Sequence, residues 1–369
     1  MRNIATLFGV LLFLCCSCNN GSRKPHYIVI DLAGSIGETT ETAMLNDFFD
    51  ITQITPLETS KEFLLSNVIF ASANMDELVI NDETGVYFVD KSSGRMLSKI
   101  DRQGNGPGEY TRIFDVNIDN DGNAVIFDTG KKTLISYTRE GGFLTSMQKD
   151  SIGLVRQLDN GAYIANYAPN VKSAYSIGIY DNDWNLLRQG VHNDTDAEYK
   201  MLYFDALNKY NGEYFFRQSP LGDTIYRITR EMDEPYIVIN KGHYKTPANI
   251  YNDLSKLNRE SSKYITQDFG RLSGKYFFIR YYYDNKCYSD IWDITESKLL
   301  YRGIIGSTGG VYGIPIMING QKVDVWPGFV SNDYIYVVIA PEDAVKFMPN
   351  ISEDDNPVIV ELKQSRSHQ

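Results

Sequence analysis

The sequence contains few of the residues that build disulfide scaffolds, zinc sites or redox centres. It has 4 cysteines and 4 histidines in 369 residues, and Cys15, Cys16 and Cys18 all lie at the end of an N-terminal apolar run. If that run is a cleaved leader, only Cys18 and Cys287 remain, and an acylated Cys18 leaves Cys287 without a disulfide partner. Because histidine is scarce, a base beside Cys287 is not expected, which argues against a nucleophilic cysteine.

Basic residues are fewer than acidic ones, 36 against 47. The formal net charge is −11, which argues against a nucleic-acid partner and against binding of anionic lipid through a basic patch. The chain contains no HExxH, GxSxG or paired-cysteine motif, so protease, esterase and zinc-site interpretations have no local support.

No apolar run is long enough to cross a bilayer. The run at 4–14 is typical of a secretory signal, and a polar segment follows the cysteines. We expect a lipoprotein signal peptide over 1–17 and lipid attachment at Cys18, with Cys15, Cys16 or an ordinary signal peptide as alternatives. The expected location is the bacterial cell envelope, lipid-anchored and facing the periplasm or the cell surface.

Aromatic and β-branched runs are abundant, and they recur. Six times a turn of Asp, Asn, Ser or Gly is followed directly by such a run. The turns are 74–76, 119–122, 159–161, 210–212, 272–274 and 331–333, and the runs start at 78, 124, 162, 214, 276 and 334. A repeat of about 40 to 60 residues is typical of propeller blades. The predicted fold is all-β, a six-bladed β-propeller of four-stranded antiparallel blades.

The blades can be placed along the chain. Blade 1 is expected to open with a strand at 67–70 and blade 2 with one at 114–118. The later blades are expected at 154–189, 204–240, 269–304 and from 329 onward. The last blade lacks an outer strand, and 51–57 can supply it by pairing with 357–362, which leaves no open edge. The propeller then spans 51–363, after a tether and N-terminal extension over 18–50 and before a tail at 364–369.

One face of this propeller carries the long connections. Every turn between the first and second strands of a blade is tight, whereas the long segments all emerge on the opposite face. These segments are 101–112, 191–201, 241–267, 306–325 and 341–356. Ile250, Leu254 and Leu257 predict a short amphipathic helix in one of them. Long loops on a rigid scaffold favour a binding site there over the alternative, in which the loops only plug the channel or pack on the rim.

Aromatic and basic residues on that face are the candidate ligand contacts. Exposed Tyr, Trp and Arg suit stacking on sugars or clamping of peptide carboxylates, while many of them will instead pack between blades. The candidates are Arg102, Glu109, Tyr110, Arg112, Tyr203, Arg217, His243, Tyr244, Arg280, Tyr281 and Trp326.

Oxygen-bearing side chains on the inner strands raise a metal hypothesis. Such side chains from several blades could converge at the axis and suit Ca²⁺, although acidic residues at strand ends usually solvate turns. They are Asp115, Asn117, Asp159, Asn208 and Asp268. No other cofactor is expected.

Three strings carry a family resemblance. They are Gly-Asn-Gly-Pro-Gly-Glu-Tyr at 104–110, Thr-Pro-Leu-Glu-Thr at 55–59 and Asp-Asn-Pro-Val-Ile at 355–359. With them the chain resembles the six-bladed propeller lipoproteins of Bacteroidetes-type bacteria, relatives of the NHL-repeat propellers, over roughly residues 50 to 363. The resemblance implies a fold and an envelope location, and it brings no catalytic residues. The 104–110 string is either a rigid inter-blade corner or a direct ligand contact.

Three functions stay open at this level. The first is a binding protein that recognises a glycan, a peptide or an envelope protein on the loop-rich face and meets the membrane through its lipid anchor only. The second is a calcium-supported lactonase- or lyase-like enzyme at the axis, since such enzymes share the fold, although fold alone does not transfer chemistry. The third is a structural scaffold in an envelope complex. The absence of a catalytic motif favours binding over catalysis.

Overall fold

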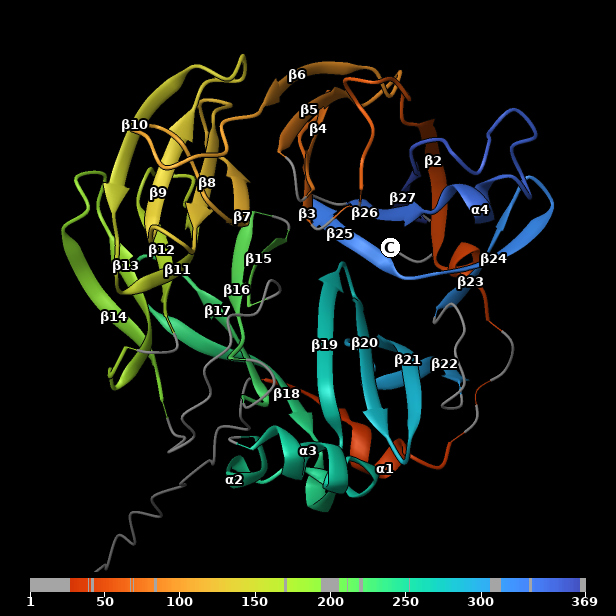
Figure 1. The fold of residues 1–369 in the computed structure, drawn as a ribbon. Coiled ribbons are helices and arrows are strands. Elements are labelled where there is room, and N and C mark those ends of the chain that lie inside the picture. The colour runs from red at the N-terminus through yellow and green to blue at the C-terminus, as the bar shows by residue number, and fades with distance from the viewer. Residues whose placement is uncertain are drawn as a thin grey trace, which may run out of the picture.

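A computed structural model describes residues 27–365, apart from 39, 41–42, 67, 69, 83–84, 169–170, 194–205, 211, 219–221, 252, 306–312 and 332–333. Six β-sheets stand around a central axis (Figure 1). The innermost strand of each sheet contacts the innermost strands of its neighbours, which closes the ring. The six-bladed propeller predicted from the repeat is therefore confirmed.

The first three blades follow the chain in order, each as an antiparallel meander. Blade 1 contains β3 (Phe70–Ala73), β4 (Glu77–Asn81), β5 (Val86–Asp90) and β6 (Met96–Ile100). Blade 2 contains β7 (Ile113–Ile118), β8 (Ala124–Asp128), β9 (Thr133–Tyr137) and β10 (Phe143–Gln148). Blade 3 contains β11 (Ile152–Gln157), β12 (Tyr163–Tyr167), β13 (Tyr175–Tyr180) and β14 (Leu186–His192).

Of the next three blades, blades 4 and 6 each include a strand from the N-terminal part of the chain. Blade 4 contains β15 (Leu207–Tyr210), β16 (Glu213–Phe216), β17 (Thr224–Ile228), β18 (Asp233–Asn240) and, outermost, β1 (Ile28–Asp31). Blade 5 contains β19 (Thr266–Ser273), β20 (Tyr276–Tyr283), β21 (Lys286–Asp293) and β22 (Lys298–Ile305). Blade 6 contains β25 (Pro327–Ser331), β26 (Tyr334–Ile339), β27 (Val358–Gln364) and β2 (Phe49–Pro56).

The opening strand of blade 1, β3, spans Phe70–Ala73 where 67–70 was predicted, and residues 67 and 69 lie outside the described ones. The range 67–70 was chosen because its residues are mostly apolar, but β3 extends up to the turn at Asn74. The side-chain oxygen of Asn74 accepts hydrogen bonds from the N–H groups of Asp76 (2.9 Å) and Glu77 (2.8 Å). This tight turn sets the register, in which Ala73 faces Leu78. Turn chemistry therefore overrides the apolar run in placing the strand.

The ring closes by pairing both ends of the chain, as predicted. β2 runs antiparallel to β27, with Phe49 opposite Gln364 and Pro56 opposite Val358. Glu361 on β27 also accepts a hydrogen bond of 2.8 Å from Lys91 of blade 1. Burial alone would raise the pKa of Glu361, but hydrogen bonds from Lys91, Thr52 and Tyr336 outweigh it and lower that pKa. The closure therefore combines a β-ladder with a buried charge contact between blades 6 and 1.

The described residues between 28 and 48 form a strap along the outside of blades 4 and 5, leading to β2. β1 pairs in parallel with β18, and the helix α1 (Leu32–Ser35) and the 3-10 helix η1 (Leu45–Asp47) follow. Arg302 of blade 5 anchors the strap, because its Nη2 donates to Ser35 Oγ (3.0 Å) and its backbone N–H to Thr40 Oγ1 (2.8 Å). The same guanidinium is paired with Asp290 at 2.6 Å, and both side chains are fully buried.

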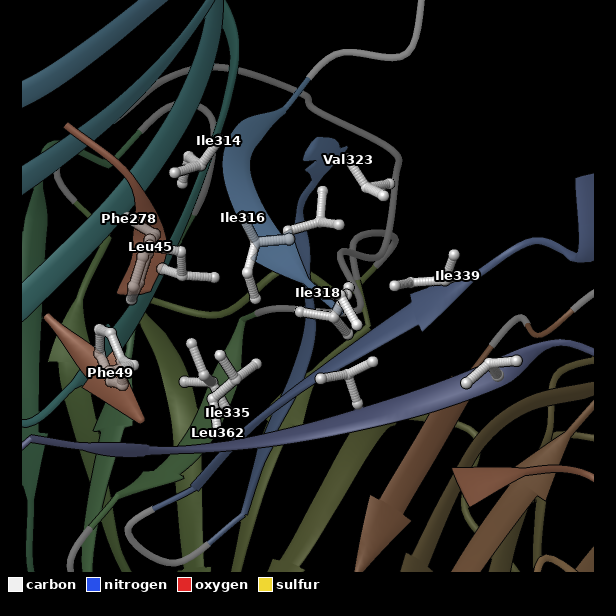
Figure 2. Packing of buried hydrophobic residues seen from close by; sticks show 14 of the residues in the cluster. Leu45, Phe49, Phe278, Ile314, Ile316, Ile318, Val323, Ile335, Ile339 and Leu362 are labelled. Atoms are coloured by element: carbon white, nitrogen blue, oxygen red, sulfur yellow. The ribbon is translucent and has the colours of Figure 1, made fainter. Parts of the chain in front are cut away.

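A hairpin outside the blades fills the packing interface, or seam, between blades 5 and 6. It consists of β23 (Ile314–Ile318) and β24 (Gln321–Val325), within a segment predicted only as a long connection. Figure 2 shows its apolar side chains directed toward the strap and both blades. The cluster includes Ile314, Ile316, Ile318 and Val323 of the hairpin, Leu45 and Phe49, and Phe278, Ile335, Ile339 and Leu362.

The loop-rich face carries the helices. The insertion after β18 contains η2 (Gly242–Tyr244), α2 (Ala248–Tyr251), α3 (Leu254–Glu260) and η3 (Ser261–Lys263) (Figure 1). The insertion is helical as predicted, but Ile250 lies in α2 and Leu254 and Leu257 lie in α3, not in one helix. Asp253 caps α3 by accepting from the N–H groups of Ser255 (3.0 Å) and Lys256 (3.3 Å). Between β26 and β27 lies α4 (Pro341–Ala344). Across the described ranges, no helix is long and apolar enough to span a membrane.

Candidate functional site

The glycine-rich string at 104–110 forms a corner held by its own groups. Glu109 turns inward and accepts from the N–H of Gly106 (2.6 Å), and Lys131 donates to the carbonyl of Glu109 (2.7 Å). Gly108 has a φ of +68°, which suits glycine. Tyr110 is only 2% exposed and lies in the core between blades 1 and 2. Hydrogen bonds close the corner, and the ring of Tyr110 packs in the core, not on the rim where a ligand contact was expected.

The other two family strings meet although they lie at opposite ends of the chain. The side-chain amide of Asn356 donates to the carbonyls of Glu58 (2.7 Å) and Phe63 (2.8 Å), and its backbone N–H donates to Thr59 Oγ1 (2.8 Å). Asn356 is 1% exposed. These strings therefore fasten the two ends of the chain, and their role in this structure is architectural.

A charge network joins blades 4 and 5 beneath the helical insertion. Arg217 is ion-paired with Asp268, whose other oxygen lies 3.1 Å from the Lys241 ammonium. Lys241 and Lys245 both reach Asp223, at 2.9 and 2.6 Å. Burial alone would raise the pKa of Asp223, but the two lysines outweigh it and lower that pKa. Arg217 was expected to contact ligand, yet it is 5% exposed and its Nε donates to the carbonyl of Gly222 (2.9 Å).

The acidic residues proposed for a calcium site are engaged with basic residues. Asp115 accepts two bonds from Arg156, at 2.5 and 3.1 Å, across the inner strands of blades 2 and 3. Asp159 lies 2.6 Å from Lys209, and Asp268 belongs to the network above. Asn117 and Asn208 are half-buried. Among the described residues no group of three or more His, Cys, Asp or Glu is placed to hold a metal ion. Calcium at the axis stays a prediction that this pairing does not favour.

Several other candidate residues on the loop-rich face lie far apart from one another. Arg102 and Arg112 are exposed, and the side chain of Arg102 donates to the carbonyl of Gly141 (3.1 Å). His243 is exposed beside Tyr244, whose ring meets Tyr283 edge-on at 4.9 Å. Tyr203 lies outside the described residues.

Two candidates meet at the loop-side end of the seam between blades 5 and 6. The Arg280 guanidinium lies 4.4 Å from the centre of the Trp326 ring. Arg280 is near the end of β20, and Trp326 directly precedes β25, so both stand at the loop-rich end of their blades. On the same strand as Arg280, Tyr282 is 37% exposed. In this cluster of Arg280, Tyr282 and Trp326, the seam cluster, the guanidinium of a predicted arginine lies over a predicted aromatic ring.

Tyr281 was predicted as a ligand contact, but its neighbour Tyr282 is the exposed residue. Its ring is fully buried, stacks on Tyr288 at 4.9 Å and faces blade 4. Side chains alternate along a strand, so Tyr282 takes the opposite face, with Arg280. The sequence Tyr281-Tyr282-Tyr283 does not show which ring is exposed. Lys241 and Asp223 were also missed, because a charged residue at a strand end gives no sign that it is buried.

Comparisons with known proteins agree with this architecture. The family described as "Domain of unknown function (DUF4934)" matches residues 27–363. A solved structure of an exported protein from Bacteroides fragilis superposes with a TM-score of 0.69 at 17% identity, covering 92% of this chain and 100% of that chain. A DUF4221 family member from Bacteroides vulgatus gives 0.52 at 10% identity, covering 86% and 98%. Curated proteins provide no match. At these identities the likeness concerns the fold, and chemistry does not follow from it.

Proposed function

The chain belongs to the DUF4934 family, a domain of unknown function, and from this premise we propose that it is a binding protein that holds its ligand on the loop-rich face. The observation that carries the proposal is the Arg280 guanidinium at 4.4 Å from the Trp326 ring, with the exposed Tyr282 on the same strand. An arginine stacked on tryptophan presents a planar cation beside apolar area.

The proposed ligand is a glycan or peptide that bears a carboxylate. Guanidinium groups match carboxylates in geometry and charge, while aromatic rings accept the apolar faces of sugars and side chains. The binding role is favoured over catalysis because Asp115 and Asp268 are held by basic residues, which removes them as ready acid–base groups.

The proposed location is the cell envelope, with a lipid on Cys18 after removal of residues 1–17. The support comes from the N-terminal sequence, whose short apolar run ends in cysteines. Radiolabelled palmitate fed to cells that express the full chain should label the wild type and not Cys18→Ser. If Cys18→Ser is still labelled, Cys15 or Cys16 is the attachment site, and if neither protein is labelled, the anchor does not exist.

Ligand binding can be tested by thermal shift on residues 19–369. A ligand present at about a hundred times its Kd stabilises the fold by about 2.7 kcal/mol. We expect an increase in Tm with glucuronate- or galacturonate-containing oligosaccharides or with acidic peptides. The increase should disappear in Arg280→Gln and in Trp326→Ala.

Arg102→Gln is the matched control, because it removes the same charge from an exposed side chain elsewhere on the loop-rich face. Equal loss in Arg102→Gln would place the site at the corner of blades 1 and 2. Stabilisation by Ca²⁺ that chelator reverses would instead favour the axial enzyme.

A further inference from the structure

Two turns on the face opposite the long loops share one design. Asp119-Asn120-Asp121-Gly122-Asn123 ends the inner strand of blade 2, and Asp181-Asn182-Asp183-Trp184-Asn185 joins the two outer strands of blade 3. In each turn the first aspartate accepts from the backbone N–H groups of the third and fifth residues, at 3.0 and 2.8 Å in both cases. The two turns therefore share this internal hydrogen-bond pattern and differ in one residue.

That residue occupies a position where glycine is suited and tryptophan is strained. Gly122 has a φ of +83° and Trp184 a φ of +63°. A side chain in this left-handed region clashes with its own backbone, and a bulky residue there is an outlier. Backbone geometry thus favours glycine at both positions. The ring of Trp184 needs another explanation, either packing or function.

The ring belongs to an aromatic group that packing leaves half-exposed. Trp184 stacks on Tyr163, with ring centres 4.7 Å apart and planes 12° apart, and meets Tyr180 at 5.4 Å. The Lys149 ammonium lies 4.6 Å from the centre of the Trp184 ring. All three rings are half-buried. Beside them Leu186 is 50% exposed. A ring that served only to fill the core would be covered, and this one is not.

The seam between blades 2 and 3 explains why the group is open. Its buried cluster consists of only Phe127, Leu134, Ile152, Val155 and Ala165, and the tyrosines and Trp184 lie at its margin. No hairpin or strap covers this seam in the described part of the chain, unlike the seam between blades 5 and 6.

We propose that Trp184, Tyr163 and Tyr180 form a second binding site, which takes an uncharged sugar ring of a glycan. The apolar face of a pyranose suits the face of the Trp184 ring that Tyr163 does not cover, where it would take the place of the Lys149 ammonium. The hydroxyl groups of the sugar suit the exposed side chains of Asn182 and Asp183 on the same turn. Asp121 is also exposed nearby, and the two carboxylates of Asp121 and Asp183 outnumber the single ammonium of Lys149 and so disfavour an anionic ligand. The site lies on the face opposite the seam cluster and shares no residue with it.

The strain at Trp184 provides a direct test. Trp184→Gly recreates the Asp-Asn-Asp-Gly-Asn turn of blade 2, so the variant should fold with an unchanged Tm or one raised by about 1–3 °C. Binding is followed by intrinsic fluorescence during titration with xylohexaose, mannohexaose and cellohexaose, three neutral probes. Wild type should show a saturable change with at least one probe, and Trp184→Gly should bind at least tenfold more weakly by calorimetry.

Tyr175→Ala is the matched control, because it removes an exposed aromatic ring from the other end of β13 and should leave the affinity for the neutral probes unchanged. Trp184→Asn, whose side chain tolerates the left-handed region, should behave as Trp184→Gly does. A fall in Tm of more than about 5 °C in both Trp184 variants would identify the ring as a core residue and overturn the proposal. So would full affinity in Trp184→Gly, or the absence of saturable binding by wild type with all three probes.

Discussion

The seams on either side of the propeller are built differently. Between blades 5 and 6, a hairpin, a strap and α4 add apolar side chains, and 18 buried residues form one cluster. Between blades 2 and 3, no added element is described, five residues are buried and four Tyr or Trp rings stay half-exposed. Insertions therefore determine how completely a seam is filled. A repeated fold can keep one seam rigid and another open, and the open seam has aromatic area available for a ligand.

The largest effect is expected from the anchor of the strap, which supplies Leu45 and Phe49 to the filled seam. Asp290→Ala leaves the guanidinium of Arg302 buried without its carboxylate, which should cost about 3–5 kcal/mol of unfolding free energy. Urea denaturation measures this cost. A loss below about 1 kcal/mol would show that the strap does not depend on this ion pair.

A matched pair of truncations compares the two seams directly. Ile316→Ala in the filled seam should cost about 4 kcal/mol, because the surrounding side chains cannot close the cavity. Ile152→Ala in the open seam should cost about 2 kcal/mol, because solvent and half-exposed rings can move into the space. Chemical denaturation of both variants gives the ratio. Equal losses would remove the distinction between the seams.

The smallest loss of stability is expected at a third seam, between blades 6 and 1, where the Lys91–Glu361 ion pair crosses the interface. Because the pKa of Glu361 is lowered below 4.5 in the folded protein, the unfolded state takes up the proton first as the pH falls. The stability from Glu361 is thus fully present above about pH 4.5 and is lost as the pH falls through the lower folded pKa. Glu361→Gln should cost about 1–2 kcal/mol at pH 7 and should flatten this acid dependence. Denaturation midpoints from pH 7 to 3 provide the measurement, and parallel curves for both proteins would contradict it.

Much of the fold was predictable because its signals are local. Turn residues and β-branched runs recur along the chain, and they located the blades to within a few residues. Pairing of 51–57 with 357–362 followed from counting strands, since an open blade edge is unfavourable. The strap was not predicted, because a single short strand such as β1 has no repeat to mark it.

The candidate sites were less predictable, for a reason that applies to propellers in general. Both faces of a blade are buried against neighbouring blades, so alternation along a strand does not separate core from surface. Tyr281 and Tyr282 illustrate this, since one is fully buried and the other exposed. Trp184 did leave a signal in the sequence, because the two turns match at four of five residues, but its meaning depends on a positive φ.

Local chemistry along the chain thus accounts for the number of blades, their strands and the closing pair of strands, because turns and β-runs act over a few residues. The partners of the charges and the exposure of the rings follow from contacts between distant segments. Asp115 meets Arg156, and Asp268 meets both Arg217 and Lys241, across blades whose relative placement no local pattern encodes. The assembled ring therefore decides which carboxylates are paired with a basic group and which aromatic rings face solvent.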